Sequence, residues 1–170
     1  MKNVVLPLRS KGMNKLERET RALESLQAVG LSGHERQYPW QLSGGMQQRV
    51  AIARALAFQP DVLVMDEPFA SVDAQTRSDL ENLMLRVRDE FGVTVVLVTH
   101  DIDEAVYLGD EVVVLSGSPT RVRDRIRVDT ELGSERDQIA TKALPEFGVL
   151  RSQVMTLIHE SASPQLLTGS

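Results

Sequence analysis

Two short, mostly apolar segments constrain the fold of this chain more than any other feature. They are residues 61–65 and 93–98, and a stretch with apolar residues at helical spacing, residues 73–91, lies between them. Continuous apolar runs of this length are typical of strands that are buried on both faces of a parallel sheet. The strand–helix–strand order therefore predicts an α/β fold with a mostly parallel sheet.

The remaining chain adds helices before this unit and strands after it. Amphipathic helices are predicted at residues 14–30, with Asn14 as the N-cap, and at 46–58, with Ser43 as the N-cap. Further elements are expected at residues 102–108 (helix), 111–115 (strand), 121–128 (strand) and 147–158 (helix). In the strand at 121–128, arginines alternate with apolar residues, which favours a solvated strand face over a basic contact patch.

Composition excludes several classes of function. The 170 residues carry 19 basic and 24 acidic side chains, a net charge of −5, which argues against a nucleic-acid partner. There are no cysteines, so disulfides, thiolate metal sites and cysteine nucleophiles are excluded. No apolar run reaches the roughly 20 residues of a membrane span, and the first residues do not resemble a signal peptide. A cytoplasmic location is the default expectation.

Ionisable side chains follow both apolar strands. Asp66 and Glu67 come directly after the first, and His100 follows the second. Parallel sheets bind ligands outside the carboxyl ends of their strands, and a carboxylate there is a common way to hold Mg²⁺. Glu67, pointing the other way along an extended chain, would then act as a base or orient a water molecule. The alternative is that both carboxylates only cap the following turn.

A second candidate site lies at the start of the helix that follows Ser43. Ser43, Gly44 and Gly45 precede or begin this helix. Glycines allow a ligand to approach the backbone closely, and the free N–H groups of a helix N-terminus favour an anion. The segment is therefore a candidate phosphate contact, although an ordinary N-cap explains the same residues.

The order of five motifs resembles that of the ATP-binding-cassette (ABC) ATPases. The motifs are L-S-G-G-M-Q-Q-R-V from Leu42, A-I-A-R-A-L from Ala51, V-L-V-M-D-E-P from Val62, S-V-D from Ser71 and T-H-D from Thr99. Five ordered motifs at family spacing are far more specific than any single one. The residues around the first and last motifs are most similar to the nitrate, sulfonate and taurine importer branch.

This resemblance implies ATP and Mg²⁺ as cofactors and a role for each matching residue. The signature loop, which contains Ser43, Gly44 and Gly45, would contact the γ-phosphate of ATP held by the opposite subunit of a dimer. Asp66 would hold Mg²⁺, and Glu67 would polarise the attacking water. Asp73 would lie in the loop that couples the two sites, and His100 would reach the γ-phosphate. The implied site residues are Ser43, Gly44, Gly45 and Asp73 for the nucleotide, Asp66 for the metal, and Glu67 and His100 for catalysis.

The resemblance also implies partners and a domain plan. Two ABC subunits form a dimer, which works with a membrane permease at the inner face of the cell membrane. A periplasmic solute-binding protein is an indirect partner. The plan assigns an α-helical signature subdomain to residues 1–58, part of the RecA-like α/β core of a P-loop NTPase to 59–128, and a C-terminal extension to 129–170.

One motif of such an ATPase does not occur in these 170 residues. The phosphate loop G-x-x-x-x-G-K-[ST] has no match here, nor does the glutamine loop that follows it in the family. We therefore expect an N-terminally truncated chain that completes a partner's site rather than hydrolysing ATP alone. One alternative is a catalytically inactive truncated fragment, or a regulatory or dimerisation remnant without its own ATPase activity. The second is half of a chromosome-maintenance ATPase. The second would need a long coiled coil ahead of the signature, where only one short helix is expected.

Overall fold

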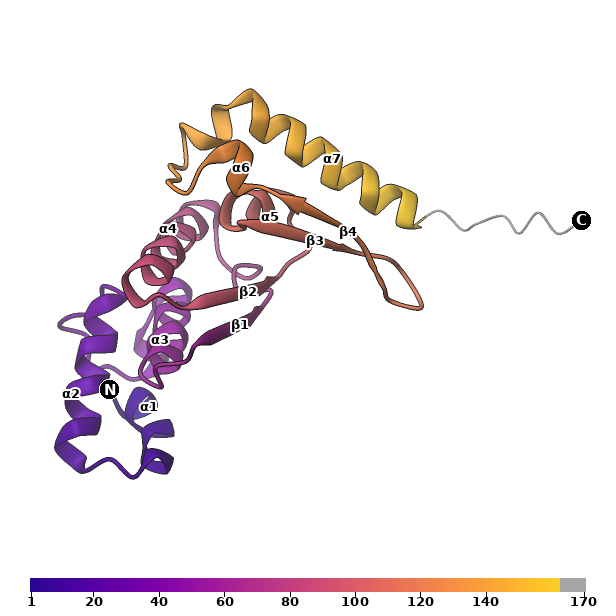
Figure 1. The fold of residues 1–170 in the computed structure, drawn as a ribbon. Coiled ribbons are helices and arrows are strands. Elements are labelled where there is room, and N and C mark those ends of the chain that lie inside the picture. The colour runs from indigo at the N-terminus through magenta and orange to yellow at the C-terminus, as the bar shows by residue number, and fades with distance from the viewer. Residues whose placement is uncertain (163–170) are drawn as a thin grey trace, which may run out of the picture. The chain divides into compact units, whose positions relative to one another are not determined.

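The computed structural model describes residues 1–162 and divides into two compact units, Met1–Val98 and Thr99–Ser170 (Figure 1). The domain boundaries expected from the sequence remain a prediction. In the part of the chain that the structure describes, no helix combines the length and the apolar character needed to cross a bilayer.

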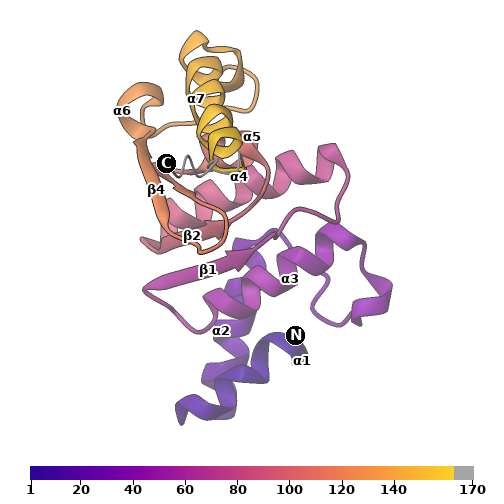
Figure 2. The same cartoon turned by 90° about the vertical axis from the view of Figure 1, so that its right-hand side faces the viewer.

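The first unit begins with a group of helices and continues into a strand–helix–strand motif (Figures 1 and 2). Helices α1, α2 and α3 pack against one another, and α3 also packs against α4. The elements are α1 (Lys2–Val5), η1 (Pro7–Lys11), α2 (Lys15–Ala28), η2 (Pro39–Gln41), α3 (Gly44–Leu56), β1 (Val62–Asp66), α4 (Ala74–Phe91) and β2 (Thr94–Val98).

Helix α2 begins and ends where the sequence predicts. The Asn14 side chain accepts the N–H of Glu17, and the Glu17 carboxylate accepts the N–H of Asn14, which forms a capping box. At the other end, Gly30 has a φ of 73°, and the N–H of Leu31 donates to the carbonyl of Leu26 over 2.8 Å. This left-handed glycine closes a Schellman motif, so the helix stops at the expected glycine.

The parallel pairing of β1 with β2 confirms the predicted strand–helix–strand unit. Val64 lies opposite Val96 in this two-stranded sheet. Asp73 caps the connecting helix α4 at its start, and Gly92, with a φ of 60°, ends it in the left-handed region. The fold is α/β, as the sequence predicts, with a parallel pair and a helical subdomain that carries the signature loop.

The prediction that both strands are buried on both faces is wrong for this structure. Leu63 is only 7% exposed, whereas its neighbour Val64 is 67% exposed, and Val96 on the same face is also exposed. Side chains alternate between the faces of a strand, so the pattern means that one face of the pair is covered and the other is open.

The second unit is built around an antiparallel hairpin. Its elements are α5 (Ile102–Leu108), β3 (Glu111–Leu115), β4 (Val122–Arg127), α6 (Asp129–Leu132), η3 (Thr141–Ala143) and α7 (Pro145–Ala162). Strand β3 occurs at the predicted residues, but it pairs antiparallel with β4 and not with a parallel neighbour. The short connection, which contains the cis Ser118–Pro119 peptide, allows the chain to reverse directly.

Helix α7 covers this hairpin with one apolar face. Phe147, Leu150 and Val154 are buried and recur at helical spacing. The helix packs against α5, β3 and β4. The predicted amphipathic segment at residues 147–158 is therefore confirmed, and its apolar face forms part of the core of the second unit.

Arginines of β4 form ion pairs at the surface. Arg123 contacts Glu160 at 2.6 Å, Arg125 contacts Glu111 at 3.1 Å, and Arg127 contacts Asp129 at 2.9 Å. Exposed pairs of this kind contribute at most about 1 kcal/mol each. They neutralise the strand, which agrees with a solvated face and not with an anion-binding patch.

The open apolar face of the β1–β2 pair predicts self-association. We expect Val64→Lys to lower concentration-dependent association, because a charge on this face opposes burial against another apolar surface. Val149→Lys is the matched control, since Val149 is 66% exposed but lies on α7, outside the sheet. Sedimentation velocity over a range of concentrations measures the effect, and an equal effect of both substitutions would contradict it.

Candidate functional site

The N-terminus of α3 is an exposed helix start capped by Ser43. The Ser43 hydroxyl accepts the N–H of Met46 over 3.3 Å, and the Ser43 carbonyl accepts the N–H of Gln47. A capped helix still presents the other N–H groups of its first turn, together with the positive end of its dipole. Ser43 and Gly44 are exposed, so an anion can reach this end of the helix.

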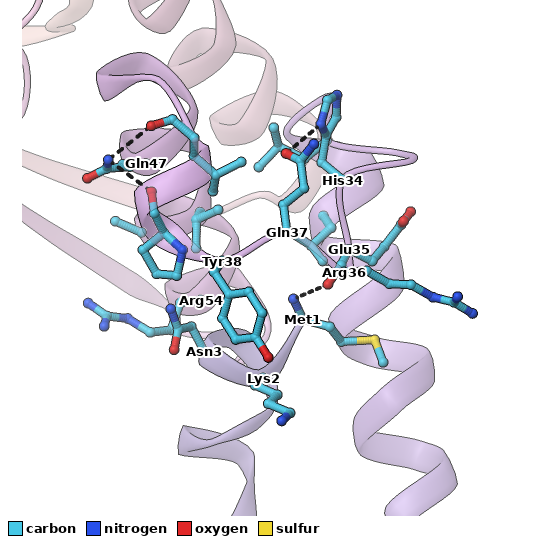
Figure 3. A pocket seen from close by; sticks show the side chains of 16 residues that line it. Met1, Lys2, Asn3, His34, Glu35, Arg36, Gln37, Tyr38, Gln47 and Arg54 are labelled. Atoms are coloured by element: carbon cyan, nitrogen blue, oxygen red, sulfur yellow. Dashed lines mark hydrogen bonds between the residues drawn. The ribbon is translucent and has the colours of Figure 1, made fainter.

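The turn before α3 is fastened to the helix by Gln47. Its side-chain amide donates to the carbonyls of Pro39 and Leu42, each over 3.1 Å (Figure 3). Within this turn, Tyr38 and Trp40 stack with ring centroids 4.5 Å apart and planes 7° from parallel. Both rings are exposed, Trp40 to 76%.

A cavity of about 420 Å³ lies among α1, α2, α3 and the loop before α3 (Figure 3). Its lining includes the apolar Leu26, Leu31 and Val50 and the basic Lys2 and Arg54. The residues assigned to nucleotide or metal by sequence are not among its lining residues. The cavity is therefore a separate feature from the candidate site.

The structure brings the signature loop next to the Asp73 loop. Thr76 in the first turn of α4 donates its N–H to Asp73 over 3.0 Å and its hydroxyl to the second carboxylate oxygen over 2.7 Å. A Cβ placed on Gly45 would lie 2.4 Å from the Cγ2 atom of Thr76. Gly45 and Asp73, which are 28 positions apart in the sequence, are thus joined through one side chain that the sequence analysis did not select.

Both hydrogen bonds that Thr76 donates affect the pKa of Asp73, the cap of α4. The hydrogen bond from the Thr76 N–H, followed by that from its hydroxyl, lowers the pKa of the Asp73 carboxyl. Asp73 is therefore held as an anion at the start of α4, where a helix N-terminus favours negative charge.

Asp66 and Glu67 lie at the carboxyl end of β1, where the sequence places them. Asp66 is the last residue of the strand, lies opposite Val98 and is exposed. Glu67 has a φ of 47°, and its N–H donates to the carbonyl of Val98 over 2.8 Å. The expectation of an extended chain at Glu67 is therefore wrong, because the backbone turns into the left-handed region there. A non-glycine residue in this region is uncommon and costs about 1–3 kcal/mol.

The residues present fit a magnesium site only in part. Within residues 1–162 no group of three or more histidine or acidic side chains is arranged to hold a metal ion. One carboxylate such as Asp66 suffices for Mg²⁺ when water and phosphate oxygens supply the other ligands. The site therefore suits a metal ion that arrives with a nucleotide, and does not suit a resident ion held by protein alone.

His100 lies in the second unit, two residues after β2 ends, and is exposed. Its neighbours are fixed by hydrogen bonds: the Thr99 hydroxyl donates to the buried Glu104 carboxylate over 2.8 Å, and the Asp101 N–H donates to the Thr99 hydroxyl over 3.0 Å. The Asp101 side chain also caps α5. Hydrogen bonds thus hold the residues on both sides of His100. The role of His100 at a nucleotide remains a prediction.

Known proteins share this combination of elements. A family model described as "ABC transporter" matches residues 2–70. An uncharacterized ABC transporter ATP-binding protein of Methanocaldococcus jannaschii is 45% identical over 166 residues, which cover 98% of this chain and 60% of that protein. In sequence the chain is therefore similar to the ATP-binding proteins of ABC transporters. The taurine import ATP-binding protein TauB of Escherichia coli (strain K12) is 41% identical over 160 residues, 93% of this chain and 63% of that protein.

Solved ABC cassettes have a similar fold. A dimeric ATP-binding cassette in a post-hydrolysis state, bound to ADP and Pi, matches with a TM-score of 0.60 and 38% identity. The match covers 75% of this chain and 55% of that chain. The chain thus spans about 60% of the length of the curated relatives described above.

Removing the cap of α3 should measurably lower the stability of the folded chain. Ser43→Ala removes the side-chain acceptor for the Met46 N–H, and we expect the free energy of unfolding to fall by about 1 kcal/mol. Ser32→Ala, at an exposed turn position, is the control. Urea unfolding followed by circular dichroism measures both, and equal effects would contradict the capping role.

Ionisation of Asp73, the cap of α4, should make the free energy of unfolding depend on pH. The pKa of Asp73 is lower in the folded chain than its ordinary value of about 3.9. The ionised cap therefore stabilises the fold fully at any pH above that ordinary value. This stabilisation is lost as the pH falls through the lower pKa of the folded state. Asp73→Asn keeps a capping oxygen but does not ionise, so its unfolding free energy should depend less on pH in this window. Asp79→Asn, on the exposed surface of the same helix, controls for the loss of one charge.

Proposed function

We propose that this chain is the signature-bearing part of an ATP-binding subunit that energises import of a small solute of the nitrate, sulfonate or taurine type. The N-terminus of α3, joined through Thr76 to the Asp73 loop, is the observation that supports the proposal. An exposed helix start beside a fixed loop is suited to grip a phosphate group from one side. The named taurine import relatives support the solute class.

In this proposal ATP is held between two subunits. The N–H groups at Ser43, Gly44 and Gly45 contact the γ-phosphate of ATP whose phosphate loop is on a second ABC subunit. Asp73 lies in the loop that couples the two nucleotide sites. Phosphoryl transfer depends mainly on positioning and charge stabilisation, which helix N–H groups supply without moving.

The carboxyl ends of β1 and β2 carry the residues proposed for hydrolysis. Asp66 would hold Mg²⁺ through water, and the ion would neutralise charge on the phosphates. Glu67, whose backbone is fixed to Val98, would accept a hydrogen bond from the attacking water and orient it. His100 would donate to the γ-phosphate. The assembly would include a membrane permease and act at the cytoplasmic face of the membrane, with a periplasmic solute-binding protein as an indirect partner.

Nucleotide-driven association tests this proposal. The chain is mixed with an intact ABC ATP-binding subunit of a taurine importer, and sedimentation velocity is recorded with ATP and Mg²⁺, with ADP, and without nucleotide. We expect ATP to promote a mixed dimer, and Ser43→Ala to weaken it several-fold relative to Ser32→Ala. The chain by itself should bind ATP weakly, because it relies on the partner's phosphate loop.

Two results would contradict the proposal. One is tight ATP binding by the chain by itself, measured by isothermal titration calorimetry. The other is a degree of association with the intact subunit that is the same with ATP, with ADP and without nucleotide.

A further inference from the structure

Thr76 contacts both the signature loop and the Asp73 loop through different atoms. Its hydroxyl donates to the Oδ2 atom of Asp73 over 2.7 Å, while its Cγ2 methyl occupies the space where a Cβ of Gly45 would be. The three residues lie in the first compact unit. A single side chain therefore connects the start of α3 with the loop before α4.

The contact with Gly45 leaves no room for an additional atom unless Thr76 moves. A Cβ at Gly45 would lie 2.4 Å from the Thr76 methyl, well inside van der Waals contact, whereas a Cβ at Gly44 would meet nothing within 4 Å. Gly45 is buried and its neighbour Gly44 is exposed. The two glycines of the signature loop thus differ: packing against Thr76 requires only the second to lack a side chain.

The two arms of Thr76 cannot move independently. Hydroxyl and methyl are bonded to the same Cβ, and a β-branched side chain has one torsion, χ1, that rotates both. If the methyl moves away from α3, the hydroxyl leaves the Asp73 carboxylate. If Asp73 moves, the hydroxyl follows it and the methyl changes its contact with Gly45.

We propose that Thr76 is a positioning residue that links the Asp73 loop to the N-terminus of α3, so that a displacement of either one is transmitted to the other. The inference rests on the proposed function, in which both segments act on nucleotide held between subunits. It adds a specific route of coupling: from the Asp73 carboxylate through the χ1 torsion of Thr76 to the backbone of Gly45.

The link is testable without nucleotide, through the pKa of Asp73 measured by carbon-detected NMR titration of its carboxyl. Gly45→Ala should raise this pKa, because the new methyl turns Thr76 and breaks its hydroxyl bond to Asp73. Gly45→Ala combined with Thr76→Ser should restore the lower pKa, since serine keeps the hydroxyl and lacks the methyl. Gly44→Ala is the matched control and should leave the Asp73 pKa unchanged.

Two outcomes of this titration overturn the link. One is a pKa of Asp73 that does not change in Gly45→Ala, which would mean that the loops are independent. The other is a pKa that rises equally in Gly45→Ala and in the combined variant, which would mean that the methyl of Thr76 is not responsible. Circular dichroism of each variant establishes that it is folded.

A second readout concerns ATP-driven association with the intact ABC subunit. Thr76→Val keeps the methyl contact and removes the hydroxyl, whereas Thr76→Ser does the reverse. A link in series is broken by losing either arm, so both variants should weaken association several-fold, to the same extent as Thr76→Ala. The positioning role would be overturned if the loss of association in Thr76→Ala equalled the sum of the losses in Thr76→Val and Thr76→Ser. It would also be overturned if either Thr76→Val or Thr76→Ser left association unchanged.

The two readouts separate this inference from the proposed function. If the wild-type chain does not associate with the intact subunit in the presence of ATP, the proposed function fails. The Asp73 titration still decides whether Thr76 links the two loops, because it depends only on the folded chain.

Discussion

The close approach of α3 to α4 is the constraint on which the candidate site depends. Gly45 lacks a side chain, so the start of α3 comes directly against the Thr76 methyl, and Thr76 in turn holds the Asp73 carboxylate. Without this approach, the signature loop and the Asp73 loop would be two separate helix caps. With it, an anion-accepting helix start and an ionised loop residue are fixed relative to each other within one unit.

The carboxyl ends of β1 and β2 form a second fixed point. The ladder between the strands is continued by the hydrogen bond from the Glu67 N–H to the Val98 carbonyl, which turns the chain immediately after Asp66. The left-handed backbone of Glu67 is maintained by that pairing. Two neighbouring carboxylates therefore leave the strand in directions set by the sheet.

Local signals in the sequence correctly predicted the N-caps of two helices, although not the left-handed backbone at Glu67. Asn14 and Ser43 cap the helices that follow them, as the sequence predicts, because a short polar side chain can reach an N–H three residues ahead. The structure adds Asp73 and Asp101 as the caps of α4 and α5. The family motifs could also be identified, since they are defined by spacing along the chain. By contrast, Thr76 has no signal of its own, because its importance comes from contact with a residue 31 positions earlier.

Burial and strand pairing were less predictable because they also depend on contacts between residues far apart in the sequence. The runs around Val64 and Val96 predict strands buried on both faces, but whether a face is covered depends on which elements pack there. Residues 111–115 predict a strand, but not that β4 would become its antiparallel partner. The sequence by itself determined the caps of α2 and α3, the strand segments and the ABC motifs, because these depend on neighbouring residues and on spacing. Only the tertiary structure decided which segments meet, because contacts such as that between Gly45 and Thr76 depend on packing between distant parts of the chain.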